Sequence, residues 1–303
     1  MQSYFIVNKL TNIFLKAATL LCATNIPLSH AAEGGSSQYL PGFYGDFGMG
    51  ITPESGTYLS NFFGYNWAEN QDYESSLLFE LPGIMHVTEQ KVLGGTYWFG
   101  FFPYALRNTF TDKTGGSRRE LEGAGAGDMY GVPVLLSWKW KELSFLAFEG
   151  IVVPTGSYSS DRLLNSGRNA WTFDQNFAIT WSPDDGKYDL SLNFGYMVNT
   201  ENKSTQYRTG DEVHIDYSAG YYILPELGVG VTGSYYRQVT PDSGLGVPAD
   251  AIEGEYSSIG PVVNYTLKMG ERDVTFTAKW LHEYDVNNHI PGDYAILRTN
   301  LKF

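Results

Sequence analysis

Residues 170–181 read Ala-Trp-Thr-Phe-Asp-Gln-Asn-Phe-Ala-Ile-Thr-Trp, and this stretch decides the fold class. Large apolar side chains occupy its odd-numbered positions from Trp171 to Trp181, with Gln175 as the exception, and most even-numbered positions are polar. Because successive side chains of a strand point to opposite faces, one face is apolar and the other is polar. A strand of about ten residues with two such faces has the length and pattern that a bilayer-spanning β-strand needs.

The same alternation returns along the chain, at residues 188–198, 213–223, 227–235 and 274–280. Several of the apolar faces end in Trp or Tyr, which is typical of the aromatic girdles at the two interfaces of a membrane. A soluble barrel with an apolar interior is the alternative, but strands in soluble proteins more often run about five or six residues. We therefore predict an all-β fold, an antiparallel transmembrane β-barrel of about twelve strands. Their expected centres lie near residues 62, 81, 98, 132, 147, 175, 193, 217, 232, 261, 278 and 297.

Short and long connections alternate between these strands. The short ones are residues 139–142, 182–186, 224–225 and 269–272; the long ones are 107–127, 154–169, 200–211, 238–254 and 284–293. Short periplasmic turns and long outer loops are the usual asymmetry of outer-membrane barrels. The segment 92–106 is apolar on both faces and contains Pro103, which leaves its register open.

The N-terminus indicates export. Lys9 and Lys16 are the only charged residues among the first 31. An apolar stretch follows at residues 17–23, and small residues surround Ala31. This pattern predicts a cleaved signal peptide over residues 1–31. The lone Cys22 would leave with it, so disulfides are not expected in the mature protein. We expect the outer membrane of a Gram-negative bacterium as the location.

Composition excludes other classes. The formal net charge of −13 argues against a nucleic-acid partner. Charged residues make up 17% of the chain, below the roughly 25% of ordinary soluble domains, and 22 tyrosines suit membrane interfaces. No mature stretch is apolar for 18 or more residues. A closed barrel is then the main way for an exported chain to span a membrane.

The two ends of the mature chain carry separate signals. Residues 32–56 do not fit a strand and contain the aromatic residues Tyr39, Phe43, Tyr44 and Phe47. We expect this segment to be a plug in the lumen or a periplasmic extension, followed by the barrel at residues 57–303. The last strand alternates and ends in Phe303, which resembles the signature read by the barrel-assembly machinery.

The sequence contains no phosphate loop, dinucleotide fingerprint, paired-cysteine metal site or nucleophile elbow. No residues can be placed in catalytic roles, so we predict neither an enzyme nor a cofactor. Glu212-x-His214-x-Asp216 places three polar side chains on one strand face, where they could bind a metal. A lumen network with Lys279, Arg298 and Lys302 as counter-charges is the preferred interpretation, because buried charges need partners. The side chains expected to line the lumen are Asp174, Asn176, Asp189, Asn193, Glu212, His214, Asp216, Lys279 and Arg298.

Several stretches resemble the outer-membrane family named for the meta-pathway of phenol degradation. They are residues 33–37, 39–42, 44–48, 154–156, 167–169, 171–173, 199–202, 207, 210–212, 235–236, 238–240 and 242–244. Residues 107–127 and 245–254 look less typical, which leaves the outer-loop contacts undefined. The resemblance covers nearly all of the mature chain and implies a transporter or channel, sometimes encoded beside genes for aromatic catabolism.

We therefore expect passive uptake of small, hydrophobic or aromatic molecules across the outer membrane. The expected partners are outer-membrane lipids, the assembly machinery and a small-molecule substrate. The residues assigned to a plug and entrance are Tyr39, Phe43, Tyr44, Asp46, Phe47, Asn199, Glu201, Asn202 and Asp211. The alternative functions are a structural or adhesive barrel that acts through its outer loops, and an enzyme.

Overall fold

The computed structural model describes residues 32–35, 37–116, 118–270 and 272–303. The predicted signal peptide, residues 1–31, lies outside the described residues. No helix in the described part of the chain is long and apolar enough to cross a membrane.

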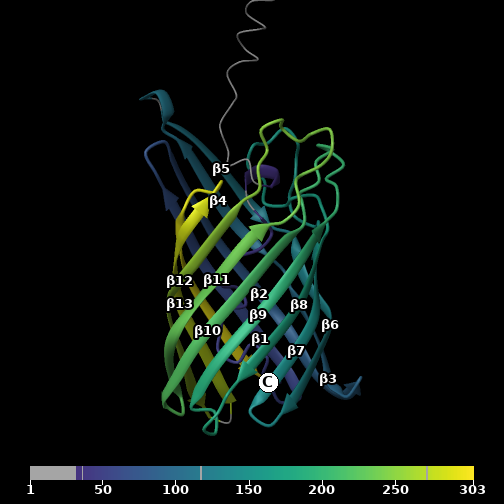
Figure 1. The fold of residues 1–303 in the computed structure, drawn as a ribbon, viewed down its shortest axis with the longest axis vertical. Coiled ribbons are helices and arrows are strands. Elements are labelled where there is room, and N and C mark those ends of the chain that lie inside the picture. The colour runs from purple at the N-terminus through teal and green to yellow at the C-terminus, as the bar shows by residue number, and fades with distance from the viewer. Residues whose placement is uncertain (1–31, 36, 117, 271) are drawn as a thin grey trace, which may run out of the picture.

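Almost all of the regular structure is β-strand (Figure 1). A short 3-10 helix, η1 (Glu33–Gly35), precedes the strands, and a second, η2 (Thr114–Gly116), lies between two of them. The strands are β1 (Gly56–Glu69), β2 (Tyr73–Val92), β3 (Gly95–Phe102), β4 (Ala105–Asp112), β5 (Arg119–Ala126), β6 (Met129–Trp140), β7 (Leu143–Val153), β8 (Thr172–Trp181), β9 (Tyr188–Asn199), β10 (Glu212–Leu224), β11 (Leu227–Gln238), β12 (Glu255–Met269), β13 (Arg272–Asn287) and β14 (Gly292–Lys302).

The strands close into one antiparallel barrel. From β6 to β14 each strand pairs with its neighbours in sequence, and β1 pairs with both β14 and β2. The β1–β14 ladder joins Tyr58 with Lys302 and Ala68 with Gly292, so the first and last strands complete the wall. Closure leaves no unpaired sheet edge facing the hydrocarbon of the bilayer, where an unpaired backbone group would be costly.

The fourteen segments form twelve wall strands, because two wall strands are interrupted. Both β3 and β4 pair with β2, and the break between them falls at Pro103 and Tyr104. β5 pairs with β4, β6 pairs with β3, and the break between β5 and β6 falls at residues 127–128. Proline has no N–H group to donate to the ladder, which accounts for the first break. The predicted barrel of about twelve strands is confirmed.

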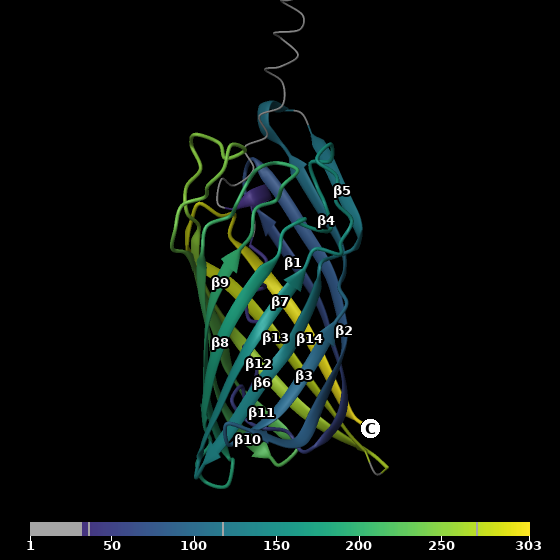
Figure 2. The same cartoon turned by 90° about the vertical axis from the view of Figure 1, so that its right-hand side faces the viewer.

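The prediction of a long loop over residues 107–127 was wrong. Most of this segment is strand, because β4 and β5 form a hairpin that rises beyond the rest of the wall, with η2 at its tip (Figure 2). The inner and outer faces of β5 carry no run of large apolar residues, since it reads Arg-Glu-Leu-Glu-Gly-Ala-Gly-Ala. A strand above the bilayer needs no lipid face and therefore gives no alternation signal.

The two faces of the wall differ as the alternation requires. Phe177 is 49% exposed on the outside of β8, whereas its neighbour Asn176 is 6% exposed. Trp171 and Trp181, near the two ends of this strand, are both exposed. The outer face is therefore apolar with aromatic residues toward its ends, and the inner face carries the polar side chains.

The two ends of the barrel differ in their connections. The long loops after β7, β9 and β11 gather at the end drawn uppermost in Figure 1, which we call the loop end. Short turns and the C-terminus lie at the opposite end, the turn end. Among these turns, Asp184 and Asp185 both have positive φ, which short polar residues tolerate better than most and which fits the predicted tight turn after β8.

Candidate functional site in the barrel lumen

The segment before β1 runs through the lumen from the loop end to the turn end (Figure 2). Along this course its residues make hydrogen bonds to inward-facing side chains of several wall strands. The lumen is therefore filled largely by the protein's own chain. This segment, residues 38–52, is called the lumen segment below.

Two tyrosines tie the outer half of the lumen segment to the polar side of the wall. The Tyr39 hydroxyl donates to Asp216 Oδ1 at 2.8 Å, and Tyr39 is buried. The Tyr44 hydroxyl donates to Asp174 Oδ2 at 2.8 Å and lies 2.7 Å from the Tyr130 hydroxyl. Buried carboxylates need donors, and these hydroxyls supply them.

His214 contacts the same two carboxylates, one through each ring nitrogen. Its Nε2 lies 3.1 Å from Asp174 Oδ1 and its Nδ1 lies 3.3 Å from Asp216 Oδ2. The imidazole also stacks on the Tyr39 ring, with centroids 4.3 Å apart. Glycine at position 195 makes room for it, because a Cβ there would lie 1.9 Å from Nε2. A compact polar cluster therefore spans β8, β10 and the lumen segment.

Asp46 is bound by two cations of the wall. Lys279 Nζ lies 2.6 Å from Asp46 Oδ1, and Arg298 Nη1 lies 2.6 Å from Asp46 Oδ2. Asp46 is buried, and the Lys279 side chain is fully buried. These contacts connect the lumen segment to β13 and β14. We call them the Asp46 latch.

The turn-end half of the lumen segment is held mainly through its backbone. Gly48 N donates to Asp189 Oδ2 at 2.9 Å, and Gly50 N donates to Thr180 Oγ1 at 2.8 Å. Phe47 meets Tyr222 edge-on, with ring centroids 6.0 Å apart. Beyond the segment, Glu54 pairs with Lys302 at the exposed turn end.

The lumen has an apolar side as well. Phe43 packs on Phe62 of β1 with centroids 4.4 Å apart, and Leu40, Tyr44 and Met49 contact the same cluster. The buried wall residues of this cluster are Phe62, Phe79, Leu81, Val87, Trp98, Phe102, Tyr130, Val132, Leu135, Leu146, Val152, Ala178, Leu281, Tyr294 and Ile296. Most of them come from β1, β2, β3, β6 and β7, whereas the polar cluster lies on β8 to β10. The lumen segment thus lies between an apolar and a polar wall.

The predicted entrance residues are distributed unevenly. Asn202 is fully buried and donates to Glu33 Oε1 at 2.9 Å, and Asn199 donates to Glu212 Oε2 at 2.8 Å. Asp211 accepts from the Tyr196 hydroxyl at 2.9 Å. Glu201 is exposed on the outer loop and takes no part in these contacts of Asn199, Asn202 and Asp211.

The outer loops also contact one another. An isolated bridge joins Arg208 with Ser243, and the Tyr207 hydroxyl donates to Asp242. Burial and the neighbouring Asp242 carboxylate raise the pKa of Tyr207, so the hydroxyl stays protonated and keeps donating at neutral pH. The loops after β9 and β11 are therefore joined at the loop end.

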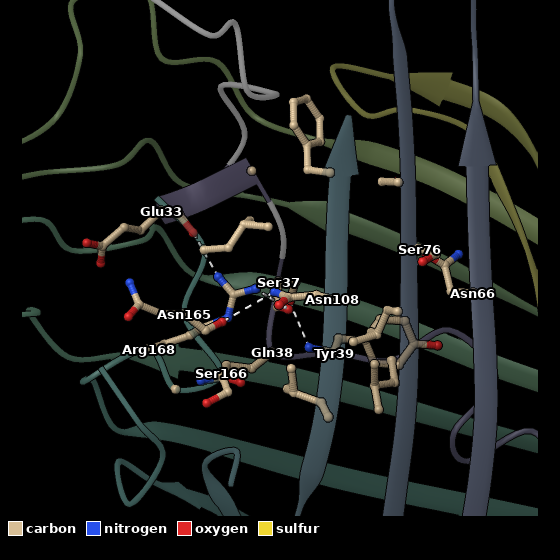
Figure 3. Close-up of a pocket in the computed structure, with 18 of the residues that line it drawn as sticks. Glu33, Ser37, Gln38, Tyr39, Asn66, Ser76, Asn108, Asn165, Ser166 and Arg168 are labelled. Carbon is tan, nitrogen blue, oxygen red and sulfur yellow. Dashed lines mark hydrogen bonds between the residues drawn. The ribbon is translucent and has the colours of Figure 1, made fainter. Parts of the chain in front are cut away.

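A cavity of about 430 Å³ lies at the loop end, between η1, the start of the lumen segment and the loop after β7 (Figure 3). Arg168 reaches into this region and donates to the backbone oxygens of Glu33 and Ser37. Gln38 Nε2 donates to Asp128 Oδ2 at 3.3 Å. This space, called the outer cavity below, ends where Tyr39 enters the lumen.

The pairing of charges differs from the sequence-based interpretation. Lys279 and Arg298 pair with Asp46 and Lys302 with Glu54, so none of them is the counter-charge of the carboxylates on β10. Glu212 instead accepts from Asn199 and Tyr236. The reason is the lumen segment, which brings its own carboxylate to the cations. No group of three or more His, Cys, Asp or Glu residues within the described ranges is arranged to hold a metal.

The remaining lumen residues from the sequence analysis also face inward. Asn193 donates to Asn176 Oδ1 at 2.8 Å, and both are buried. The sequence analysis missed Asp128 and Arg168, which organise the outer cavity, and the tyrosines Tyr236 and Tyr256 stacked above Tyr39. Tyr236 and Tyr256 occupy inward positions of the alternation, whereas Asp128 and Arg168 lie between strands, where alternation gives no signal. The family-like stretches at residues 167–169 and 235–236 pointed to Arg168 and Tyr236 without giving them a role.

A family profile described as "Putative MetA-pathway of phenol degradation" matches residues 70–299. The chain belongs to this family. Among solved structures, the "COG4313 outer membrane channel from Pseudomonas putida F1" is 15% identical, with 88% of this chain and 100% of that chain covered and a TM-score of 0.67. The likeness shows a shared outer-membrane barrel fold. Together with the fold, it assigns this member of the phenol-degradation family to the outer membrane of a Gram-negative bacterium.

Two other solved barrels are more distant from this family member. The translocator domain of the autotransporter NalP from Neisseria meningitidis is 9% identical, with 83% of this chain and 90% of that chain covered and a TM-score of 0.45. The CymD monoaromatic hydrocarbon channel is 8% identical, with 83% and 89% covered and a TM-score of 0.40. A comparison with curated proteins gives no match.

Proposed function

We propose that this protein is an outer-membrane channel for passive uptake of small hydrophobic or aromatic compounds, with residues 32–56 acting as its plug. The observation that carries the proposal is the lumen segment, which is held by reversible polar contacts rather than by covalent links. Wall side chains alone fill the interior of a barrel of about eight strands, whereas the wider lumen here is filled by a separate segment. A separate segment that fills the lumen instead offers a part that can move while the wall stays intact.

The chemistry of the lumen supports this substrate class. The apolar wall around Phe62 and Phe102 and the lumen-segment ring of Phe43 would contact an apolar solute once the segment moves. The polar cluster opposite can form hydrogen bonds with a hydroxyl group. The family description points to phenol metabolism, and the similar Pseudomonas putida protein is described as an outer membrane channel.

Deletion of residues 38–48 tests the proposal. The deletion removes Tyr39, Tyr44 and Asp46 and, with them, their contacts to the wall at Asp216, Asp174, Lys279 and Arg298. Vesicles that contain the folded deletion variant should take up phenol and benzoate at rates several-fold different from wild type, after subtraction of the leak of protein-free vesicles. Heat-modifiable migration on a gel reports whether the barrel has folded.

The alternative function, a structural or adhesive barrel acting through its outer loops, gives a different result. Flux through the wild type and through the folded deletion variant would then be equally negligible for every solute. That outcome would reject the channel, whatever its substrate.

We infer that the barrel-assembly machinery recognises the last strand. Phe303 follows β14, and its backbone N donates to Thr57 O at 3.0 Å, next to the ladder that closes the barrel. Removal of Phe303 should reduce the amount of folded protein in the outer membrane, whereas Phe303→Trp should retain it. Equal yields of the deletion and wild type would contradict the inference.

A further inference from the structure

We infer that the outer cavity is a binding site for a single uncharged aromatic ring of about the size of phenol, occupied before the solute reaches the lumen segment. This inference rests on the proposed channel, whose entrance the cavity would form. At about 430 Å³ the cavity falls within the range of small-molecule sites. A second cavity, beside Thr172, Asn199 and Glu212, measures about 20 Å³ and is too small for a ring.

One wall of the outer cavity is a ladder of stacked rings. Tyr39 stacks on Tyr236 at 6.0 Å, Tyr236 on Tyr256 at 4.7 Å, and Tyr256 on His289 at 4.8 Å. All four side chains line the cavity. Since neighbours in the ladder cover both faces of Tyr236 and Tyr256, their edges are what remains for a ligand. Ring edges are positive and attract the face of another aromatic ring.

The other walls are largely aliphatic. Leu77 of β2, Leu106 of β4 and Leu164 of the loop after β7 line the cavity. Hydroxyl groups lie among them, as Ser76 and Thr109 form a pair with their oxygens 2.8 Å apart. Apolar side chains with a few polar groups are the usual composition of a site for a small, weakly polar ligand.

The charged side chains around the cavity already make hydrogen bonds within the protein. The Glu33 carboxylate accepts from Asn202 at 2.9 Å and from Thr205 at 2.7 Å. The Arg168 guanidinium donates to two backbone oxygens, and Arg162 Nη2 donates to Ser157 Oγ at 3.0 Å. A charged ligand would lose its hydration and would have to compete with these hydrogen bonds for a partner, which disfavours it relative to a neutral ring.

The test measures binding separately from flux. Isothermal titration of the purified full-length mature protein in detergent should show saturable binding of phenol. It should show weaker binding of benzoate, which has the same ring and a charge, and of cyclohexanol, which has the hydroxyl but no aromatic ring. Benzoate or cyclohexanol binding as tightly as phenol would overturn the assigned ligand class.

Space-filling substitutions locate the binding. Ala68 is buried on the inner face of β1 and lines the cavity, so Ala68→Phe should weaken phenol binding by about tenfold or more. Ala278→Phe adds the same ring to the exposed outer face of β13 and should leave binding unchanged. Ser160→Trp, on the exposed rim of the cavity, gives a second test if Ala68→Phe fails to fold.

The outcomes separate the site from the channel. Phenol binding that neither Ala68→Phe nor Ser160→Trp weakens, or no saturable binding at all, would overturn the site even if vesicles show flux. Binding lost in these variants, in a protein without flux, would support the site and reject the channel.

Discussion

At Asp46 one carboxylate connects the lumen segment to two strands of the wall. Sequence reasoning selected Asp46 for the plug and Lys279 and Arg298 for the lumen, but it paired the cations with carboxylates of β10 instead. The partners lie 233 and 252 residues from Asp46 along the chain. Alternation in a sequence shows which face of a strand a residue occupies. It does not show which distant residue that side chain contacts, least of all when the partner lies outside the strands.

Asp46→Asn should loosen the lumen segment. The substitution leaves Lys279 buried without its counter-charge, and removal of one partner from a buried ion pair costs about 3–5 kcal/mol. Single-channel recordings in planar bilayers should therefore show open events more often than in wild type. Glu54→Gln is the matched control, because it removes an exposed carboxylate from its pair with Lys302. Identical recordings for Asp46→Asn and wild type would show that the latch does not control the lumen.

At the scale of strands, alternation predicted most of the wall. All twelve expected strand centres fall inside observed strands, since each lipid-facing strand must be apolar on one side. The hairpin of β4 and β5 was missed because Glu120, Glu122 and Gly123 give it no apolar face. The hairpin pairs with β2 through β4, which follows the break at Pro103. From the sequence alone, the register of residues 92–106 had remained open.

Phe194→Arg tests the assignment of faces in β9. Phe194 is 45% exposed on the outer wall, and an arginine at mid-bilayer depth on a barrel costs about 2–4 kcal/mol. Refolding into lipid vesicles should give a lower yield or a lower denaturant midpoint than wild type. Phe194→Leu keeps an apolar side chain there and should refold like wild type. Equal behaviour of the two variants would mean that this face does not contact the lipid hydrocarbon.

At the scale of the whole molecule, the sequence indicated that residues 32–56 could be a plug, but it did not indicate the course of this segment through the barrel. The four aromatic residues of the segment could equally have packed against a periplasmic surface. In the structure Tyr39, Phe43 and Tyr44 meet wall residues from β1, β8 and β10, which become neighbours only once the barrel has closed. The outer cavity is likewise a product of assembly, because η1, several strands and the loop after β7 line it together.

A disulfide between the lumen segment and the wall tests whether the segment must move for transport. A Cβ placed on Gly45 would lie 2.6 Å from Thr232 Oγ1, which is the atom that the sulfur of a cysteine at position 232 would replace. The two positions are therefore close enough for a disulfide bond after small shifts of the backbone. Cys22 lies in the predicted signal peptide, so Gly45→Cys with Thr232→Cys introduces the two thiols expected in the mature chain. The oxidised protein should show several-fold less uptake in vesicles than the same protein after reduction with dithiothreitol, because the disulfide holds the segment in the lumen. The reduced form serves as the control, since sequence and fold are identical. Equal uptake in the two redox states would mean that solutes pass without displacement of the segment, and the plug would then have to be rejected even if the channel were retained.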